Sequence, residues 1–282
     1  MQRYSSLLLM LLLISLNSQA AEAKRIVALA PHIVENLFTV GAGDLIVGTV
    51  DYADFPAQAN QIPRIGGYNG IQLEKLLALK PDLVIAWQTG SKKIDLEKVE
   101  KLGIKVVYSE AKDINKVADE LRLFGQLTGN VQQAEGAAGA FTAQFNAIKG
   151  RYADTPSLKV FYQLWPEPMM TVNKNTWIHQ LLMVCGVENA FANNATDYPQ
   201  ISIENVIKVS PQVIIVPDEK TKKQVEMVDW HKWPELPAVK YDQFITVNAD
   251  LLHRYSTRVL DGVTDMCDKI LASKAFYQAQ VK

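Results

Sequence analysis

The sequence of 282 residues contains only two cysteines and four histidines, and its formal net charge at pH 7 is −1. A charge so close to zero provides no electrostatic footprint for nucleic acid or for an anionic membrane. The histidines are His32, His179, His231 and His253, and no two of them have the HxH or HExxH spacing of a metal site. The composition therefore predicts no nucleic-acid partner and no metal centre.

Motifs of several enzyme classes are absent as well. The chain has no GxSxG nucleophile elbow, no Walker P-loop and no GxGxxG fingerprint. Carboxylate pairs such as Asp51 with Asp54 have no identifiable catalytic partner. We therefore predict a protein that performs no catalysis and holds no cofactor. A secreted hydrolase that uses an Asp or His of a cleft is the alternative from a different class.

Long apolar segments are missing except at the N-terminus. Leu7–Leu16 is apolar apart from Ser15, it follows Arg3, and residues 18–20 have the small-x-small pattern of a cleavage site. Ten residues are too few to cross a bilayer, which needs about 20. Residues 1–20 are therefore predicted to be a cleavable signal peptide for export. A short membrane anchor is the alternative.

The two cysteines, Cys185 and Cys267, belong to this exported chain. An even number of cysteines outside the cytoplasm indicates one disulfide. In the chain-entropy model, closing a loop of this length stabilises the fold by roughly 4 kcal/mol. Two free thiols, one of them reactive, are the alternative. The disulfide would join two predicted helices in the second half of the chain.

Short apolar segments alternate with helical patterns. The expected strands are Arg25–Ala30, Leu45–Thr49, Leu83–Trp87, Lys105–Tyr108, Lys159–Trp165 and Phe244–Val247. The expected helices lie near Glu35–Thr39, Leu73–Ala78, Lys92–Lys101, Trp177–Val184 and Thr257–Ala272. This alternation is typical of βαβ units, so the predicted fold class is α/β with mainly parallel sheets.

Residues 71–87 and 201–217 match each other at a constant offset of 130 without gaps. The first copy reads IQLEKLLALKPDLVIAW and the second reads ISIENVIKVSPQVIIVP. Each has the pattern of a short amphipathic helix, a proline-marked turn and a buried strand. Any helix–proline–strand unit has this general pattern, but the fixed register and the shared glutamate, Glu74 and Glu204, favour a structural repeat. Two copies predict two similar lobes.

Residues 131–154, between the two copies, are expected to contain one long helix. Apolar residues recur there at helical spacing, namely Ala134, Ala138, Phe141, Phe145 and Ile148. No Gly/Ser-rich or Pro-rich run that would form a flexible hinge is present. We therefore predict an N-terminal α/β lobe at 21–130, an interlobe helix at 131–154 and a C-terminal α/β lobe at 155–282, with little lobe movement.

Ligands of open α/β sheets bind beyond the carboxyl ends of the strands. Four aromatic residues lie at or after predicted strand ends, namely Tyr52, Tyr68, Trp87 and Trp165. Their apolar faces and polar tips suit a large, flat, partly polar ligand. Partial burial explains any one of them, whereas four together favour a cleft between the lobes. His32 and His253 also fall at cleft positions, so a contact through both histidines is a further possibility.

Glu74 and Glu204 lie in the first turn of their predicted helices, where the helix dipole favours a carboxylate. The dipole explains either residue alone. Their matched placement suggests a second role, in which one surface carboxylate on each lobe meets basic residues of a two-fold partner.

Together these features resemble the substrate-binding proteins of siderophore, haem and cobalamin importers. The resemblance rests on LAPHIVE, VGTVDYADFP, GIQLEKLLALKPDLVIAW, LGIKV, VCGVENAF, YPQIS and the two cysteines, which span nearly the whole chain after residue 20. The motifs are most similar to those of the cobalamin (vitamin B12) binders. The resemblance implies a monomeric periplasmic protein that delivers cobalamin, as transported ligand, to an inner-membrane ABC permease and ATPase complex.

The resemblance also implies roles for single residues. Tyr52 and Trp87 match cleft aromatics of the family, and Tyr68 stands where the family carries a tryptophan. Glu74 and Glu204 match two glutamates that dock on the permease. A ferric siderophore or haem is the alternative ligand. A siderophore site would require several Arg or Lys residues, and a haem site would require an axial His or Tyr.

A late Asp-x-x-x-Arg segment of the family is matched by Asp250 and Arg254. Between them, Leu251-Leu252-His253 replaces an aromatic-rich triplet. The predicted ligand-binding residues are therefore Tyr52, Tyr68, Trp87, Trp165, His32, Asp250, Leu251, Leu252, His253 and Arg254.

Overall fold

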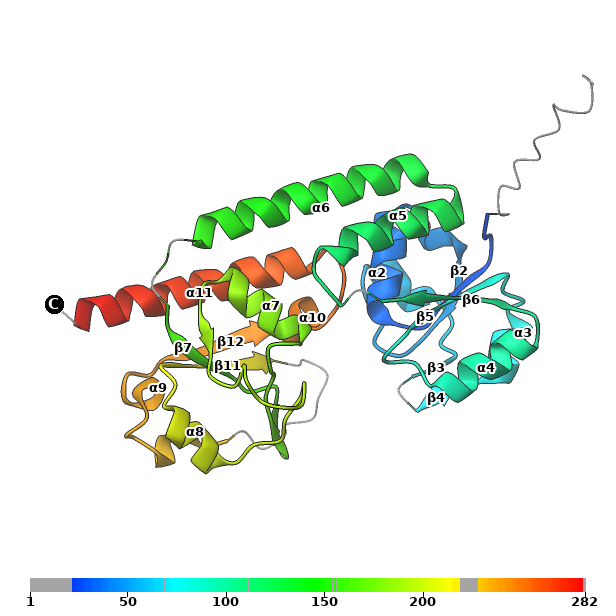
Figure 1. Ribbon diagram of the computed structural model, residues 1–282. Helices are drawn as coiled ribbons and strands as arrows, with labels where there is room; N and C mark the ends of the chain where they lie inside the picture. The colour runs from blue at the N-terminus through cyan, green and yellow to red at the C-terminus, as the bar shows by residue number, and fades with distance from the viewer. Residues whose placement is uncertain are drawn as a thin grey trace, which may run out of the picture.

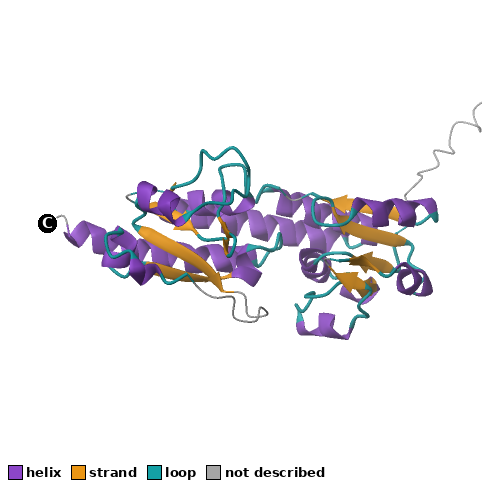
Figure 2. Cartoon of the chain, turned by 90° about the horizontal axis from the view of Figure 1, so that it is seen from below, coloured by secondary structure: helices purple, strands orange, loops and turns teal. Residues whose placement is uncertain are grey.

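The computed structural model describes residues 22–67, 69–110, 112–153, 155, 157–218 and 228–280. The predicted signal peptide and Tyr68 lie outside these residues. Two α/β lobes lie below the long helix α6, Val131–Tyr152 (Figure 1). Seen from below, the lobes occupy opposite ends of the molecule and helices extend between them (Figure 2). Among the described residues, none of the helices combines the length and the apolar character needed to cross a membrane.

The N-terminal lobe contains a parallel four-stranded sheet in the order β2-β1-β5-β6. Its strands are β1 Ile26–Ala28, β2 Ile46–Thr49, β5 Leu83–Trp87 and β6 Lys105–Ser109. Its helices are α2 Pro31–Thr39, α3 Leu73–Ala78, α4 Lys93–Lys101 and α5 Lys116–Thr128, with short 3-10 helices η1 Gly43–Leu45 and η2 Ala57–Gln61. Strands β3 Gly66–Gly67 and β4 Gly70–Ile71 form a separate hairpin.

The C-terminal lobe repeats this plan with the sheet order β10-β7-β11-β12, again parallel. Its strands are β7 Lys159–Tyr162, β10 Glu188–Asn189, β11 Val213–Asp218 and β12 Phe244–Asn248. Its helices are α7 Trp177–Val184, α8 Ile203–Val209, η3 Trp230–Lys232, α9 Pro237–Lys240, α10 Ala249–Leu252 and α11 Val259–Gln280. Strands β8 Trp165–Pro166 and β9 Met169–Met170 form a hairpin.

The internal repeat is a structural one. Helices α3 and α8 begin 130 residues apart, and so do strands β5 and β11. In both copies the residue before the proline has a left-handed backbone, with φ of 47° at Lys80 and 51° at Ser210. Strand β5 lies between β1 and β6, and β11 holds the corresponding place between β7 and β12. The prediction of two similar α/β lobes is confirmed.

Each sheet is covered on both faces, which explains why its strands are apolar along their whole length. The inner faces belong to one core that extends through both lobes and contains buried residues of α2, α5, α6, α7 and α11. The outer faces pack against α3 and α4 in one lobe, and against α8 and α9 in the other. Helix α6 therefore joins the lobes through a continuous core as well as through the chain.

The largest differences from the predicted elements are one additional helix and two shifted ends. Helix α5 was not predicted, although Val117, Leu121 and Phe124 recur on one buried face and Gly129 ends the helix with φ 80°. The strand expected at 159–165 ends at Tyr162, and a new hairpin starts at Trp165. Helix α11 continues eight residues beyond the predicted end at 272, to residue 280.

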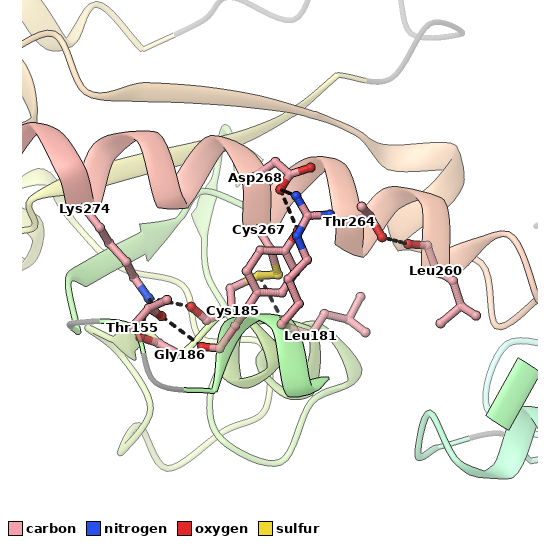
Figure 3. Close-up of a disulfide and its surroundings, with 11 residues drawn as sticks. Thr155, Leu181, Cys185, Gly186, Leu260, Thr264, Cys267, Asp268 and Lys274 are labelled. Atoms are coloured by element: carbon pink, nitrogen blue, oxygen red, sulfur yellow. Dashed lines mark hydrogen bonds and ion pairs between the residues drawn. A yellow bond between two sulfur atoms is a disulfide. The ribbon is translucent and has the colours of Figure 1, made fainter. Parts of the chain in front are cut away.

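The Cys185–Cys267 disulfide is present, as predicted, and joins the end of α7 to α11. Lys274 of α11 lies beside it and is only 2% exposed. Its Nζ donates to Thr155 Oγ1 at 2.6 Å and to the carbonyls of Cys185 at 2.7 Å and Gly186 at 2.9 Å (Figure 3). This lysine satisfies two carbonyl groups that the end of α7 leaves open.

The end of α6 is attached to the same helix. Arg151 and Tyr152 both donate to Asp268 Oδ1 of α11, at 2.8 Å and 2.6 Å. Helices α6, α7 and α11 are thus fastened together at the outer end of the C-terminal lobe.

Candidate ligand-binding site between the lobes

A pocket of about 190 Å³ opens at the carboxyl ends of β1, β2 and β5. Pro31, Tyr52 and Trp87, which come at or after these strand ends, are among the residues that line it. Sites for drug-sized ligands usually enclose roughly 300–1,000 Å³. The pocket is therefore large enough for an edge or substituent of a bulky ligand, whose remainder would extend toward the other lobe. In that lobe, β11 and β12 end on the side that faces the N-terminal lobe (Figure 1).

Tyr52 stands out at the rim of this pocket. Its side chain is 63% exposed. Its backbone has φ 63°, a left-handed conformation that bulky residues rarely adopt. Such strain is concentrated at ligand-binding positions, because it has to be held by the surrounding structure. Tyr52 thus presents a solvent-exposed aromatic face on a fixed backbone.

Trp87, the last residue of β5, is held on several sides. A Cβ atom at Gly90 would lie 1.8 Å from Trp87 Cε3, so only glycine permits the observed contact. The rings of His32 and Tyr255 each have their centroid 5.6 Å from that of Trp87. The indole is therefore fixed before any ligand arrives.

His32 is buried in the N-terminal lobe, with 3% of its surface exposed. Its Nε2 lies 3.0 Å from Ser109 Oγ, whose hydroxyl donates to Glu120 Oε1 at 2.5 Å. Because the serine has one proton and gives it to the carboxylate, Nε2 of His32 donates to the serine. Burial, followed by the nearby charge of Arg254, lowers the pKa of His32 from 6.5 to about 3.

His32, Ser109 and Glu120 do not form a nucleophilic triad. In a triad the histidine accepts the serine proton and the acid orients the histidine. Here Ser109, which is fully buried, is bonded to the acid itself. His253 instead pairs with the hydroxyl of Tyr162 at 2.9 Å. The structure gives the two predicted cleft histidines different partners, and their joint contact to a ligand stays a prediction.

Arg254 is the centre of an ion network between the lobes. Its guanidinium donates to Glu35 Oε1 at 2.7 Å, Asp54 Oδ1 at 2.8 Å and Asp250 Oδ1 at 2.8 Å. Arg258 also donates to Glu35, at 3.0 Å. Arg254 is 8% exposed, and Glu35 is 2% exposed. Arg254, which was predicted to contact the ligand, thus forms ion pairs with three carboxylates. Its pair with Glu35 joins α2 to the C-terminal lobe.

The other ligand-binding residues predicted in the C-terminal lobe differ in how far they are buried. Trp165 is half-buried, and its Nε1 donates to the Glu167 carbonyl at 2.9 Å. Leu251 is half-buried as well. Leu252, in contrast, is fully buried in the shared core. We correct the expectation for Leu252 accordingly, because the turn of α10 directs its side chain into the core and away from any cleft.

Tyr255 was missed by the sequence analysis. Its ring centroid lies 5.3 Å from that of His32 and 4.6 Å from that of Trp177, besides its contact with Trp87. Burial, followed by the nearby Tyr198, raises the pKa of the Tyr255 hydroxyl. Its position could have indicated a role in the site, because Tyr255 directly follows Arg254 in a segment that otherwise lacks the aromatic residues expected there.

Glu74 and Glu204 are both exposed in the first turns of α3 and α8. Residues 71–76 and 201–206 have the same sequence of exposed and buried positions, so the two carboxylates are presented alike. A hydrogen bond from Ser202 lowers the pKa of the Glu204 carboxyl. No group of three or more His, Cys, Asp or Glu within the described ranges is arranged to hold a metal ion.

Comparisons with known proteins identify the family and the fold of the chain. The family model described as "Periplasmic binding protein" matches residues 26–251. A vitamin B12-binding protein of Vibrio vulnificus (strain YJ016) is 34% identical over 260 residues, which cover 92% of this chain and 94% of that protein. The crystal structure of the periplasmic vitamin B12 binding protein BtuF of Vibrio cholerae matches with a TM-score of 0.82 and 34% identity over 89% of this chain and 98% of that one.

A haem binder has the same fold. The periplasmic heme-binding protein RhuT from Roseiflexus sp. RS-1 matches with a TM-score of 0.80 at 24% identity, over 89% of this chain and 99% of that one. At this identity the likeness concerns the fold alone.

Proposed function

The chain belongs to the periplasmic binding protein family, and from this premise we propose that it captures cobalamin in the periplasm and delivers it to an inner-membrane ABC importer. The observation that carries the proposal is the match to vitamin B12-binding proteins along nearly the whole chain. We also propose that residues 1–20 are the signal peptide for export, that the lobes divide at 131–154, and that the protein acts as a monomer.

In the proposed complex, the ligand lies between the lobes at the carboxyl ends of both sheets. Tyr52 and Trp87 would contact it from the N-terminal lobe, and Trp165 would contact it from the hairpin β8–β9. Cobalamin suits this arrangement because its corrin ring is large and its side chains are neutral amides. Aromatic faces contact such a ring, while the partly exposed carboxylates of Asp54 and Asp250 offer acceptors for amide N–H groups.

The charges near the site favour a neutral ligand over an anionic one. The guanidinium of Arg254 is engaged by three carboxylates, as described above. Lys92 lines the pocket, but its Nζ donates to the Asn69 carbonyl at 2.7 Å, and Asp51 and Asp95 line the same pocket. The propionates of haem, or an anionic siderophore, would therefore meet more acidic than basic groups. This observation ranks cobalamin above the alternative ligands.

We propose that Glu74 and Glu204 dock the loaded protein on the importer. They lie on different lobes, at equivalent places of the repeat. Basic residues of a two-fold symmetric permease would pair with both and fix the orientation of the protein.

Calorimetry of the purified protein without residues 1–20 tests the ligand assignment. Cyanocobalamin, haemin and a ferric hydroxamate are titrated separately, and we expect saturable binding of cyanocobalamin alone. Binding of haemin or of the hydroxamate with no heat from cyanocobalamin would overturn the proposal. Chemical analysis of the recovered ligand provides the control for catalysis, since a binding protein returns it unchanged.

A further inference from the structure

The segment Arg254-Tyr255-Ser256 connects α10 to α11 in the C-terminal lobe, yet it is bound by α2 of the N-terminal lobe. Arg254 and Ser256 both donate to the carboxylate of Glu35. The side-chain amide of Asn36 donates to the carbonyl of Tyr255 at 3.0 Å. Glu35 is 2% exposed and Asn36 is fully buried. Adjacent residues of α2 thus fix the backbone on both sides of Tyr255.

This anchoring places the ring of Tyr255 between aromatic residues of both lobes. Trp177, in the first turn of α7, lies 4.6 Å away between ring centroids on the side of the C-terminal lobe. His32, in the first turn of α2, and Trp87, the last residue of β5, lie 5.3 Å and 5.6 Å away on the other side. Trp177 is itself fixed, because its Nε1 donates to the Leu252 carbonyl at 2.8 Å.

Tyr255 therefore restricts the orientation of Trp87. The Gly90 backbone lies against one part of the indole, and His32, which is locked to Ser109, lies edge-on to it. Tyr255 provides a second aromatic contact, and among the described residues it is the one from outside the N-terminal lobe. Aromatic pairs in tilted arrangements prefer particular geometries, so removal of the ring would let the indole rotate.

We propose that Tyr255 is a positioning residue of the ligand site, which holds the Trp87 indole in the orientation that a planar macrocycle requires. Residues 251–253 lack the aromatic side chains that the family carries there, and Tyr255 supplies an aromatic ring nearby. The inference rests on the proposed function, because it assumes that Trp87 contacts the ligand. Preorganised contacts strengthen binding because less conformational freedom is lost when the ligand arrives.

Two substitutions separate the ring of Tyr255 from its hydroxyl. Calorimetry with cyanocobalamin should show affinity lowered about 10-fold for Tyr255→Ala and changed less than about 2-fold for Tyr255→Phe. Tyr255→Leu, which fills the space without a ring, serves if the alanine variant does not fold. Tyr241→Ala is the matched control, because Tyr241 packs against Phe276 and Tyr277 away from the cleft. It should leave the affinity unchanged.

A double-mutant cycle distinguishes positioning from simple stabilisation. In a Trp87→Ala background, Tyr255→Ala should lower the affinity by less than about 2-fold further, because the group that it positions is gone. An equal loss in both backgrounds, or wild-type affinity of Tyr255→Ala and Tyr255→Leu alike, would overturn the inference. Failure of the wild-type protein to bind cyanocobalamin would instead overturn the proposed function.

Discussion

At the scale of single residues, the candidate site depends on how firmly Trp87 is held. The substitution Trp87→Ala should weaken cyanocobalamin binding by about 1–3 kcal/mol, as expected for a well-packed aromatic anchor. Calorimetry at fixed temperature and salt measures the change. Trp233→Ala is a suitable control, because Trp233 packs on Trp230 in the outer core of the C-terminal lobe. Equal affinity of Trp87→Ala and wild type would remove Trp87 from the site.

His32 makes a prediction about pH. Its pKa is about 3 in the folded protein and 6.5 in an unfolded chain, so the unfolded state takes up a proton as the pH falls between these values. The free energy of unfolding should therefore fall by about 1.4 kcal/mol per pH unit below pH 6.5, or about 2 kcal/mol at pH 5.

Urea unfolding of wild type and His32→Gln at pH 7 and pH 5 measures this contribution. The variant retains a donor for Ser109 and should lose about 2 kcal/mol less than wild type on acidification. His231→Gln, at an exposed position, is the matched control. Identical pH dependence of wild type and His32→Gln would show that His32 does not govern the effect.

Some residues of the candidate site could be predicted from sequence and others could not. Tyr52 comes after one recognisable strand and Trp87 ends another, and the carboxyl end of a strand is where ligands of such sheets bind. The ion pairs of Arg254 join residues 219 and 200 positions apart, to Glu35 and Asp54, and no local pattern reveals such partners. The contacts of Tyr255 depend on the same long-range arrangement.

At the scale of secondary-structure elements, the C-terminal lobe is held by the disulfide between α7 and α11. The double substitution Cys185→Ser with Cys267→Ser should lower the free energy of unfolding by about 2–5 kcal/mol, because 82 residues separate the cysteines and the unfolded chain gains freedom. Urea unfolding measures the loss, and dithiothreitol should reproduce it in wild type but not in the variant. Equal stability of both proteins would contradict the prediction.

Elements with a clear sequence pattern were predicted more accurately than elements whose ends depend on tertiary contacts. Strands β5 and β11 are continuous apolar runs that end at clear signals, and their predicted positions were nearly right. The sequence 159–165 reads as one strand, but β7 ends at Tyr162 and a separate hairpin begins at Trp165. Pro166 lacks a backbone N–H and lies in this two-stranded hairpin outside the four-stranded sheet. Helix α11 continues beyond its predicted end because Lys274 and Tyr277 find buried partners there, which periodicity does not show.

At the scale of the whole molecule, the repeat places one exposed glutamate on each lobe. The double substitution Glu74→Ala with Glu204→Ala should leave cyanocobalamin binding unchanged and abolish uptake, because the proposed docking role requires both charges. Calorimetry and an uptake assay with labelled cobalamin test the two parts. Glu97→Ala with Glu188→Ala, one exposed glutamate from each lobe, is the control. Normal uptake by the first variant would refute the docking role.

The two-lobed plan could be read from the repeat at offset 130, and the long helix between the copies could be read from its apolar spacing. The contact between the lobes could not be predicted. It depends on residues 254–258, whose partners lie on α2 and in the loop after β2. Sequence patterns describe the halves of such a protein, whereas long-range pairing of buried charges determines how the halves meet.

The same pairing has a consequence for which part of the chain the candidate site requires. Glu35 and Asn36 lie early in the chain, but their partners lie 219 to 223 residues later. An unpaired buried carboxylate is strongly destabilising. A chain that ends before residue 254 lacks these partners, so we expect it to lack the contact that places Tyr255 beside Trp87.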